Sequence, residues 1–272
     1  MSDEPFASRP RILLDCDPGH DDAMAIVAAA RYADLVGITT VAGNAPLERT
    51  TYNARVMRDL LSLDVPVHSG SPRPLVAEAK VATFVHGESG LDGADLPVPT
   101  TPLDGIDAVT FIVDTCRTVA DVWLVAVGPL TNIALALRAA PDIASRIAGI
   151  SLMGGGTFGN RTATGEFNIW ADPEAASIVF GYGGRLVMAG LDVTHQFQAT
   201  PERIARIDAL PGVLAVVFAD LFAYFSDNYR SRHDPGSIEG AAVHDPFAVL
   251  ALTHPELFDR VDRHVAIETR GE

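Results

Sequence analysis

Residues 12–22 read Ile-Leu-Leu-Asp-Cys-Asp-Pro-Gly-His-Asp-Asp and place four carboxylates directly after a short apolar run. The apolar residues predict a buried strand, Pro18-Gly19 predicts a tight turn, and Ala23 to Ala30 predicts the opening of a helix. The acids therefore lie at the carboxyl end of a strand, where open α/β sheets place their ligands. Carboxylate oxygens suit Ca²⁺ or Mg²⁺, whereas softer metals favour Cys and His. We therefore expect a divalent cation at this point of the chain.

The acids of this stretch could also serve as helix caps, as an EF-hand loop or as part of a phosphoaspartate enzyme. Acids in the first turn of a helix complement the helix dipole and cap free N–H groups, and Asp21 and Asp22 could serve only that purpose. An EF-hand loop is excluded, because the twelfth position counted from either earlier aspartate is not the glutamate that such a loop needs. A phosphoaspartate enzyme is disfavoured, because no basic residue follows to hold a phosphate.

Length and composition favour one large α/β domain. A chain of 272 residues is within reach of a single unit, so we expect one domain over residues 1–272. Apolar residues make up 48% of the chain, and the apolar runs at Trp123 to Val127, Ile147 to Met153 and Leu186 to Ala189 lack alternation. Such runs are typical of strands that helices cover on both faces.

Charge and cysteine content narrow the functional class. The formal net charge of -15 argues against a nucleic acid or an anionic membrane as partner. Two cysteines, far apart in the sequence, make a disulfide framework improbable. Met1 to Pro10 is polar, and no later run approaches the length of a membrane helix. We therefore expect a cytoplasmic enzyme.

Strand-like and helix-like segments alternate along the chain. Strands are expected at 12–14, 35–41, 65–68, 123–127, 147–153 and 186–189, and helices at 23–30, 47–63, 107–118, 211–229 and from residues 131, 173 and 245 onward. This alternation predicts βαβ units and a mostly parallel, Rossmann-like sheet flanked by helices. Residues 69–105 are rich in Pro and Gly and predict a long functional or mobile loop.

Polar residues recur just after the strand-like runs, and each has a purely structural alternative. Asn44 could be a turn residue, and His86 could lie in a solvated part of the long loop. Asp245, beside His244, could cap the helix that it precedes. Their coexistence at strand ends is the argument for a common site.

A glycine-rich loop and three polar residues follow the strand at 147–153. Met153-Gly-Gly-Gly156 lacks the lysine of a phosphate-binding loop, so we interpret it as a close approach of backbone to a neutral polar ligand. Asn160, Glu166 and Asn168 carry the donors and acceptors that a polyhydroxylated ligand such as a sugar requires.

Taken together, these motifs resemble those of the calcium-dependent inosine-uridine nucleoside hydrolases. The resemblance covers essentially the whole chain and is carried by Asp15–Asp22, Val41–Asn44, His86–Gly93, Gly128–Asn132, Met153–Gly155, Glu166–Asn168, Leu191–His195 and His244–Pro246. The first of these motifs combined with the last is highly specific. The resemblance implies the nucleoside hydrolase fold and hydrolysis of the N-glycosidic bond of inosine- or uridine-type ribonucleosides to ribose and free base.

The resemblance also implies a role for each matched residue. Ca²⁺ would be bound by Asp17, Asp22, Asp245 and the backbone carbonyl of Val127. Asp17 would also take a proton from the metal-bound water, and His244 would assist departure of the base. The substrate would be held by Asp21, Asn44, Met153, Asn160, Glu166 and Asn168, with His86 as a further candidate.

Several features stay open at this point. The chain stops where relatives usually continue with a strand and a helix, so we expect either a naturally short protein or a truncated sequence. The segment from Asp227 to Ala242 matches the family's variable flap poorly, which leaves the base preference open. His195 and His233 are alternatives to His244 as the residue that assists departure of the base. Relatives are commonly dimers or tetramers, so we expect a homodimer or homotetramer.

Two rival functions use the same residues. The first is a non-catalytic nucleoside or ribose sensor, which would bind its ligand and leave it intact. The second is a hydrolase of another N-riboside, such as nicotinamide riboside. Retention of Asp17 and His244 disfavours the sensor.

Overall fold

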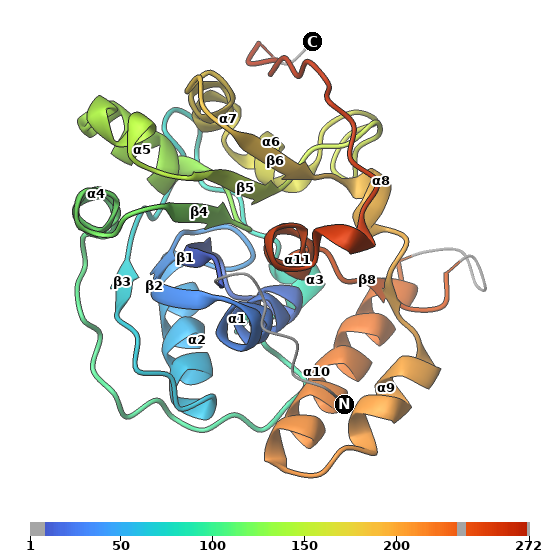
Figure 1. The fold of residues 1–272 in the computed structure, drawn as a ribbon. Helices are drawn as coiled ribbons and strands as arrows, with labels where there is room; N and C mark the ends of the chain where they lie inside the picture. Colours follow the sequence, from blue (N-terminus) through green and yellow to red (C-terminus); the bar gives the residue numbers. More distant parts are fainter. Residues whose placement is uncertain (1–8, 233–237, 271–272) are drawn as a thin grey trace.

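The computed structural model describes residues 9–232 and 238–270, which form a central sheet covered by helices on both faces (Figure 1). Within these residues the sheet has six parallel strands in the order β3-β2-β1-β4-β5-β6. They are β1 (Arg11–Cys16), β2 (Asp34–Thr40), β3 (Val67–Ser69), β4 (Val122–Ala126), β5 (Gly149–Met153) and β6 (Leu186–Ala189). The predicted α/β class and parallel sheet are confirmed.

The predicted helices are present, with bounds that differ by a few residues. The longer ones are α1 (His20–Tyr32), α2 (Leu47–Leu60), α4 (Ala108–Thr118), α5 (Thr131–Ala139), α7 (Pro173–Phe180), α10 (Val213–Arg230) and α11 (Pro246–Thr253). Short helices are α3 (Thr83–His86), α6 (Phe167–Ala171), α8 (Leu191–Thr194) and α9 (Pro201–Asp208), with 3-10 turns η1 (Pro141–Ser145) and η2 (Pro255–Leu257). A small antiparallel pair, β7 (Gln198–Ala199) and β8 (Ala241–Ala242), joins the chain before α9 to the segment before α11. Neither α9 nor this pair was expected from the sequence.

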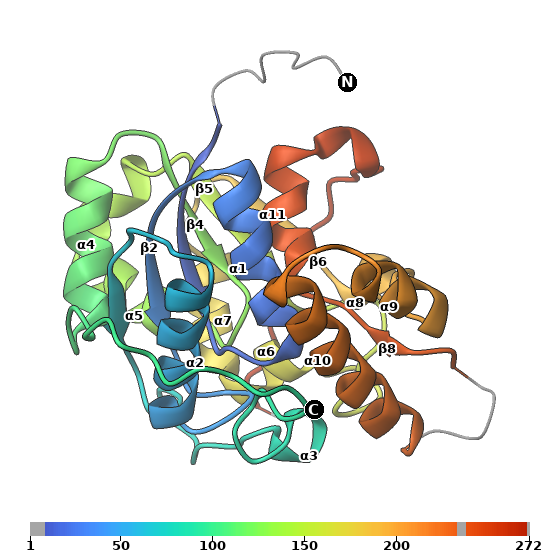
Figure 2. The ribbon, with the colours of Figure 1, turned by 90° about the horizontal axis from the view of Figure 1, so that it is seen from below.

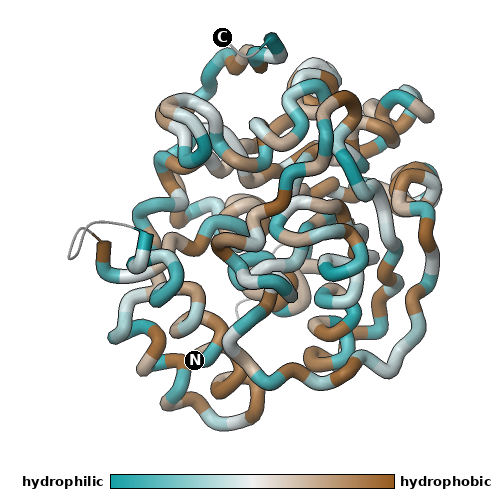
Figure 3. Tube along the Cα trace, turned by 180° about the vertical axis from the view of Figure 1, so that it is seen from behind, coloured by the Kyte–Doolittle hydropathy of each residue, from teal (hydrophilic) through white to brown (hydrophobic). Residues whose placement is uncertain are grey.

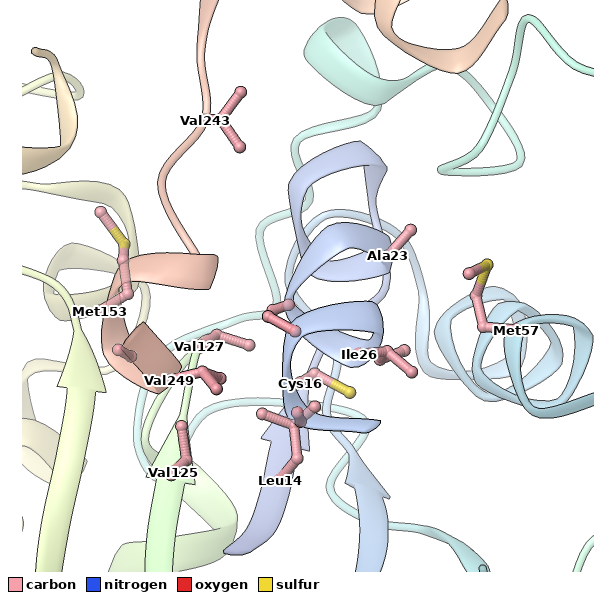
Figure 4. Close-up of a cluster of buried hydrophobic side chains, with 14 of the residues drawn as sticks. Leu14, Cys16, Ala23, Ile26, Met57, Val125, Val127, Met153, Val243 and Val249 are labelled. Atoms are coloured by element: carbon pink, nitrogen blue, oxygen red, sulfur yellow. The ribbon is translucent and has the colours of Figure 1, made fainter. Parts of the chain in front are cut away.

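The pleat of β1 separates two hydrophobic layers. Ile12, Leu14 and Cys16 face a cluster that α1, α10 and α11 cover, part of which is drawn in Figure 4. Leu13 points the other way, into a cluster formed with α4, α5 and α7. Because side chains alternate along a strand, Asp15 also turns toward α5. The first acid of the motif is thereby separated from those that follow the strand.

The α9–α10 hairpin closes one side of the fold. Figure 2 shows α10 running beside α1 and ending near α3 in the long loop. Asn228 of α10 donates hydrogen bonds to the carbonyl oxygens of Phe84 (3.1 Å) and Val85 (2.5 Å). Outer helices alternate hydrophilic and hydrophobic residues along the chain (Figure 3), as expected where one helix face is buried. No described helix combines the length and apolar character that crossing a bilayer requires.

Candidate active site

A pocket of about 420 Å³ lies beyond the carboxyl ends of the central strands. Of the predicted site residues, it is lined by Asp21, Asn44, His86, Val127, Met153, Asn160, Glu166, Asn168, His244 and Asp245. Asp17 and Asp22 lie next to it, because both accept hydrogen bonds from Asn44. The structure therefore brings all the predicted residues to one place, although they come from segments far apart in the sequence.

Acidic side chains gather at one end of this pocket. Asp21, Asp22 and Asp245 each offer a carboxylate oxygen within 4.8 Å of the other two. Asp17 is not in this group of three, but the carboxyl of Asp22 contacts both Asp17 and Asp245. All four side chains are buried, with at most 4% exposure. The beginning of α1 and the beginning of α11 thus meet at a cluster of four acids.

The turn around Asp17 and Asp22 is held by backbone and amide donors. Asp22 accepts from the N–H groups of Asp17 and Gly19, each at 3.0 Å, and from the side-chain amide of Asn44 at 2.8 Å. Asp17 accepts from the Asn44 N–H at 2.7 Å through Oδ2, whereas its buried Oδ1 has no partner among the described residues. Asp22 therefore does accept hydrogen bonds from N–H groups at the start of α1, as the cap interpretation proposed. That interpretation does not explain why Asp17 is buried with one oxygen unpaired among the described residues.

Two glycines shape the space that the Asp17 carboxylate occupies. A Cβ atom at Gly43 would overlap Oδ2 of Asp17, and one at Gly128 would overlap Oδ1. Gly43 precedes Asn44, and Gly128 follows Val127, so both lie on loops beyond strand ends. Only glycine allows the backbone to approach the carboxylate this closely.

Burial and mutual repulsion raise the pKa of these carboxyls. Burial is the largest cause of the raised pKa for all four, and burial together with the charge of Asp22 raises the pKa of Asp21 to about 7. Neighbouring acids raise the pKa further for Asp17, Asp21 and Asp245. None of the ion pairs between described residues involves one of these four acids. Several buried oxygens without a countercharge are the donor set that a hard divalent cation prefers, so the residues fit such an ion.

Asp245 is the first residue before α11, yet its side chain makes no capping hydrogen bond to that helix. The purely structural role considered for it is therefore absent. Its carboxyl instead contacts that of Asp22. Asp21 accepts a hydrogen bond from the backbone N–H of His244 at 3.2 Å, which ties the start of α1 to the turn before α11.

The amide of Asn168 links two strand ends. Its Nδ2 donates to the carbonyl oxygens of Val127 (2.9 Å) and Met153 (3.2 Å), at the ends of β4 and β5. Glu166 caps α6 by accepting from the N–H groups of Asn168 and Ile169, and it also accepts from Gly155 at 3.0 Å. Glu166 and Asn168 are therefore rigid parts of the wall.

Asn160 is the exposed member of the predicted set, on the loop at the mouth of the pocket. Its Oδ1 accepts a hydrogen bond from the Phe167 N–H at 2.9 Å. Arg161 and Arg232 also line the pocket, and each guanidinium lies over the ring of Phe84, at 4.8 Å and 5.1 Å from its centroid. The mouth is thus aromatic and cationic, in contrast to the acidic end.

His86 is buried, not solvated as its place in a long loop suggested. Its ring stacks on His20 and on Phe225 of α10, with centroid distances of 5.3 and 5.1 Å. The Nδ1 atoms of the two histidines are 3.1 Å apart. Burial lowers the pKa of His86 well below its ordinary value. The pocket therefore has one wall made of flat, uncharged rings.

His244 lines the pocket, and its backbone N–H donates to Asp21 of α1. Its Nδ1 is 2.7 Å from the hydroxyl of Thr194 in α8. Burial, followed by the nearby His195, lowers the pKa of His244 to about 3. His195 also lines the pocket, with its ring centroid 5.3 Å from that of His244. His233, the third candidate, lies outside the described residues.

Comparison with known proteins agrees with this geometry. The sequence profile of the inosine-uridine preferring nucleoside hydrolases matches residues 12–272. The chain belongs to this family. It is 45% identical over 266 residues to the pyrimidine-specific ribonucleoside hydrolase RihA of Escherichia coli (strain K12), covering 96% of this chain and 85% of that protein.

Solved structures of nucleoside hydrolases share the fold. A purine-preferring ribonucleoside hydrolase from Gardnerella vaginalis superposes with a TM-score of 0.85 at 33% identity, over 91% of this chain and 81% of that one. An inosine-guanosine nucleoside hydrolase gives a TM-score of 0.81 at 28% identity, over 91% and 79% of the two chains. The expected family is therefore confirmed.

Gly43, Gly128 and Thr194 are among the residues that shape the site of this nucleoside hydrolase and were not expected from the sequence. Gly43 and Gly128 adjoin the predicted residues Asn44 and Val127, so their positions were visible in the motifs. Their role was not, because it depends on where Asp17 points. Thr194 stands beside His195 in a matched motif, but only the folded chain brings it to a second histidine.

Proposed function

We propose that this nucleoside hydrolase breaks the C1′–N bond of ribonucleosides with a water molecule activated at a Ca²⁺ site. Family membership supports the reaction class. The metal site is supported by the meeting of Asp21, Asp22 and Asp245 beside the pocket and by the fact that Asp245 does not cap its own helix. Buried charges cost free energy unless they are paired, and a bound cation that takes part in hydrolysis would pair them.

Asp17, Asp22, Asp245 and the Val127 carbonyl are the proposed ligands of the cation. Bound Ca²⁺ supplies a positive charge that lowers the pKa of a water molecule and accepts sugar hydroxyls as ligands in a flexible geometry. Asp17 is the proposed general base, because its Oδ1 is buried beside the cluster and has no partner among the described residues. The glycines around Asp17 fix the direction of this carboxylate.

The remaining residues divide between the two halves of the substrate. Asp21, Asn44, Asn160, Glu166 and Asn168 are proposed to hold the ribose hydroxyls, with Met153 against the ring. The C1′–N bond of a nucleoside breaks through an oxocarbenium-like state, which an anionic wall stabilises. The stacked rings around His86 suit a flat base, and His244 is proposed to assist its departure.

Pyrimidine ribonucleosides are the proposed preferred substrates. The chain is 45% identical to a pyrimidine-specific hydrolase and 33% identical to a purine-preferring one. A homodimer or homotetramer and a cytoplasmic location remain predictions, to be checked by light scattering of the purified protein and by cell fractionation.

The direct experiment measures release of reducing sugar from uridine, cytidine, inosine and adenosine with added Ca²⁺. We expect turnover that chelation abolishes, that Asp17→Asn removes, and that Asp15→Asn retains, since Asp15 faces α5 away from the pocket. Binding of a nucleoside without cleavage would support the sensor instead. Turnover of nicotinamide riboside ahead of all four nucleosides would support a different N-riboside as substrate.

A further inference from the structure

The hydroxyl of Thr194 is buried directly behind the ring of His244. Thr194 ends α8 and has no exposed surface, and its Oγ1 lies 2.7 Å from Nδ1 of His244. Because Nδ1 contacts Thr194, it faces the protein. His244 is partly exposed and lines the pocket, so Nε2 is the nitrogen left for the substrate. This contact joins a residue with no assigned role to the proposed leaving-group histidine.

Counting donors and acceptors favours one direction for this hydrogen bond. A buried hydroxyl has one proton to donate, and leaving it without an acceptor costs roughly 1–3 kcal/mol. Within the described residues, the side-chain partner of the Thr194 hydroxyl is Nδ1 of His244, and the contact alone does not say which atom donates. If Nδ1 carried the proton, the hydroxyl proton would lose this partner. This count favours the O–H of Thr194 as the donor to Nδ1.

We propose that Thr194 is a positioning residue that holds His244 in the tautomer with its proton on Nε2, so that the ring donates a hydrogen bond to the departing base. This inference rests on the proposed hydrolase function. A neutral imidazole with a fixed Nε2–H is an electrophile that needs no change of protonation to stabilise developing negative charge. Thr194 acts only through His244.

The chemistry balances without a further reactant. As the C1′–N bond breaks, its electron pair passes to the base, and the Nε2–H of His244 donates a hydrogen bond to the base atom that gains charge. The water oxygen forms the new bond to C1′, and the water proton taken up by Asp17 finally neutralises the base. His244 ends in the same tautomer in which it began.

The test compares two substrates that differ in leaving group. Uridine releases a poor leaving group, whereas p-nitrophenyl β-D-riboside releases a stable phenolate that needs no hydrogen bond. In Thr194→Val we expect kcat for uridine to fall on the order of 10²-fold, the scale of proton-transfer assistance, with little change for the phenyl riboside. Thr194→Ser retains the hydroxyl and should retain wild-type ratios of the two rates.

A matched control removes a buried threonine hydroxyl elsewhere. Thr51 of α2 bonds Thr40 and Ser69, away from the pocket, so Thr51→Val should affect both substrates equally. An equal loss on both substrates in Thr194→Val, or no loss on uridine, would overturn the proposal. Wild-type inactivity on both substrates would instead refute the proposed function.

A second measurement does not depend on activity. The ¹⁵N shifts of the His244 ring, assigned by their loss in His244→Gln, report which nitrogen carries the proton. We expect the Nε2–H form in the wild type and in Thr194→Ser, and a mixture of forms in Thr194→Val. A proton on Nδ1 in the wild type would contradict the inference directly.

Discussion

Added Ca²⁺ should stabilise this protein against heat, because the four buried acids repel one another when no cation lies between them. Burial and the neighbouring acids raise the pKa of Asp17, Asp21 and Asp245, which means that the charged forms of these carboxyls are disfavoured in the folded protein. A cation that binds only the folded chain shifts the folding equilibrium by mass action. The effect should disappear when one ligand is removed.

The size of the shift follows from the length of the chain. At a Ca²⁺ concentration 100 times the dissociation constant, binding stabilises the folded state by about 2.7 kcal/mol. A chain of 272 residues that unfolds in one step has an unfolding entropy of roughly 0.6 kcal/mol/K, so Tm should rise by about 5 °C. If Asp245→Asn weakens binding about 100-fold, the same Ca²⁺ concentration should raise Tm by only about 1 °C.

The assay is thermal unfolding followed by circular dichroism, with Ca²⁺ or with a chelator. In chelator, Asp245→Asn should unfold at or above the wild-type Tm, since the substitution relieves repulsion. Asp15→Asn is the matched control: it neutralises a buried acid of the same motif that faces α5, and it should keep the full shift. An equal Ca²⁺ shift in Asp245→Asn and in the wild type would refute the reasoning.

Three more substitutions test separate parts of the site. Gly128→Ala should displace the Asp17 carboxylate and weaken Ca²⁺ binding about tenfold or more, measured by calorimetry; unchanged affinity would argue against Asp17 as a ligand. Asn44→Ala removes a donor from buried Asp22 and should lower the free energy of unfolding by about 2 kcal/mol in urea, and a neutral effect would contradict this. Burial raises the pKa of Asp15 from 3.8 to about 7. Between these pH values the folded state binds one more proton than the unfolded state, so the free energy of unfolding falls as pH rises from about 4 to 7. Asp15→Asn should reduce that fall by up to roughly 4 kcal/mol, measured by urea unfolding across this pH range, and parallel curves would count against the assignment.

The parallel sheet was predictable because its signal is local. Strands covered on both faces are continuous apolar runs, and helices between them carry their own start signals at residues such as Pro173. The two-residue strands β7 and β8 gave no such signal, since two residues have no periodicity. Helix α9 was missed although Thr200 caps it, because the cap alone does not distinguish a helix from a turn.

The site was predictable as a location but not in all its contacts. Parallel strands bring their carboxyl ends to one edge, which is why the acids after β1 and the residues after β2, β4 and β5 meet. The surroundings of His86 depend on Phe225, which lies far along the chain on α10. No local pattern shows such a contact, so the sequence favoured a solvated loop. The exact ligand set, including Asp17, stays a prediction.

The acids that converge here come from the two ends of the described chain, Asp17 just after β1 and Asp245 just before α11. During synthesis Asp245 leaves the ribosome only after the strands β1 to β8 and the helices α1 to α10 have been made. A nascent chain that ends before Asp245 therefore lacks the complete cluster, and we expect the proposed Ca²⁺ ion to bind only after this segment has been made. Binding of the ion would then report that the segments around Asp17 and Asp245 have folded together.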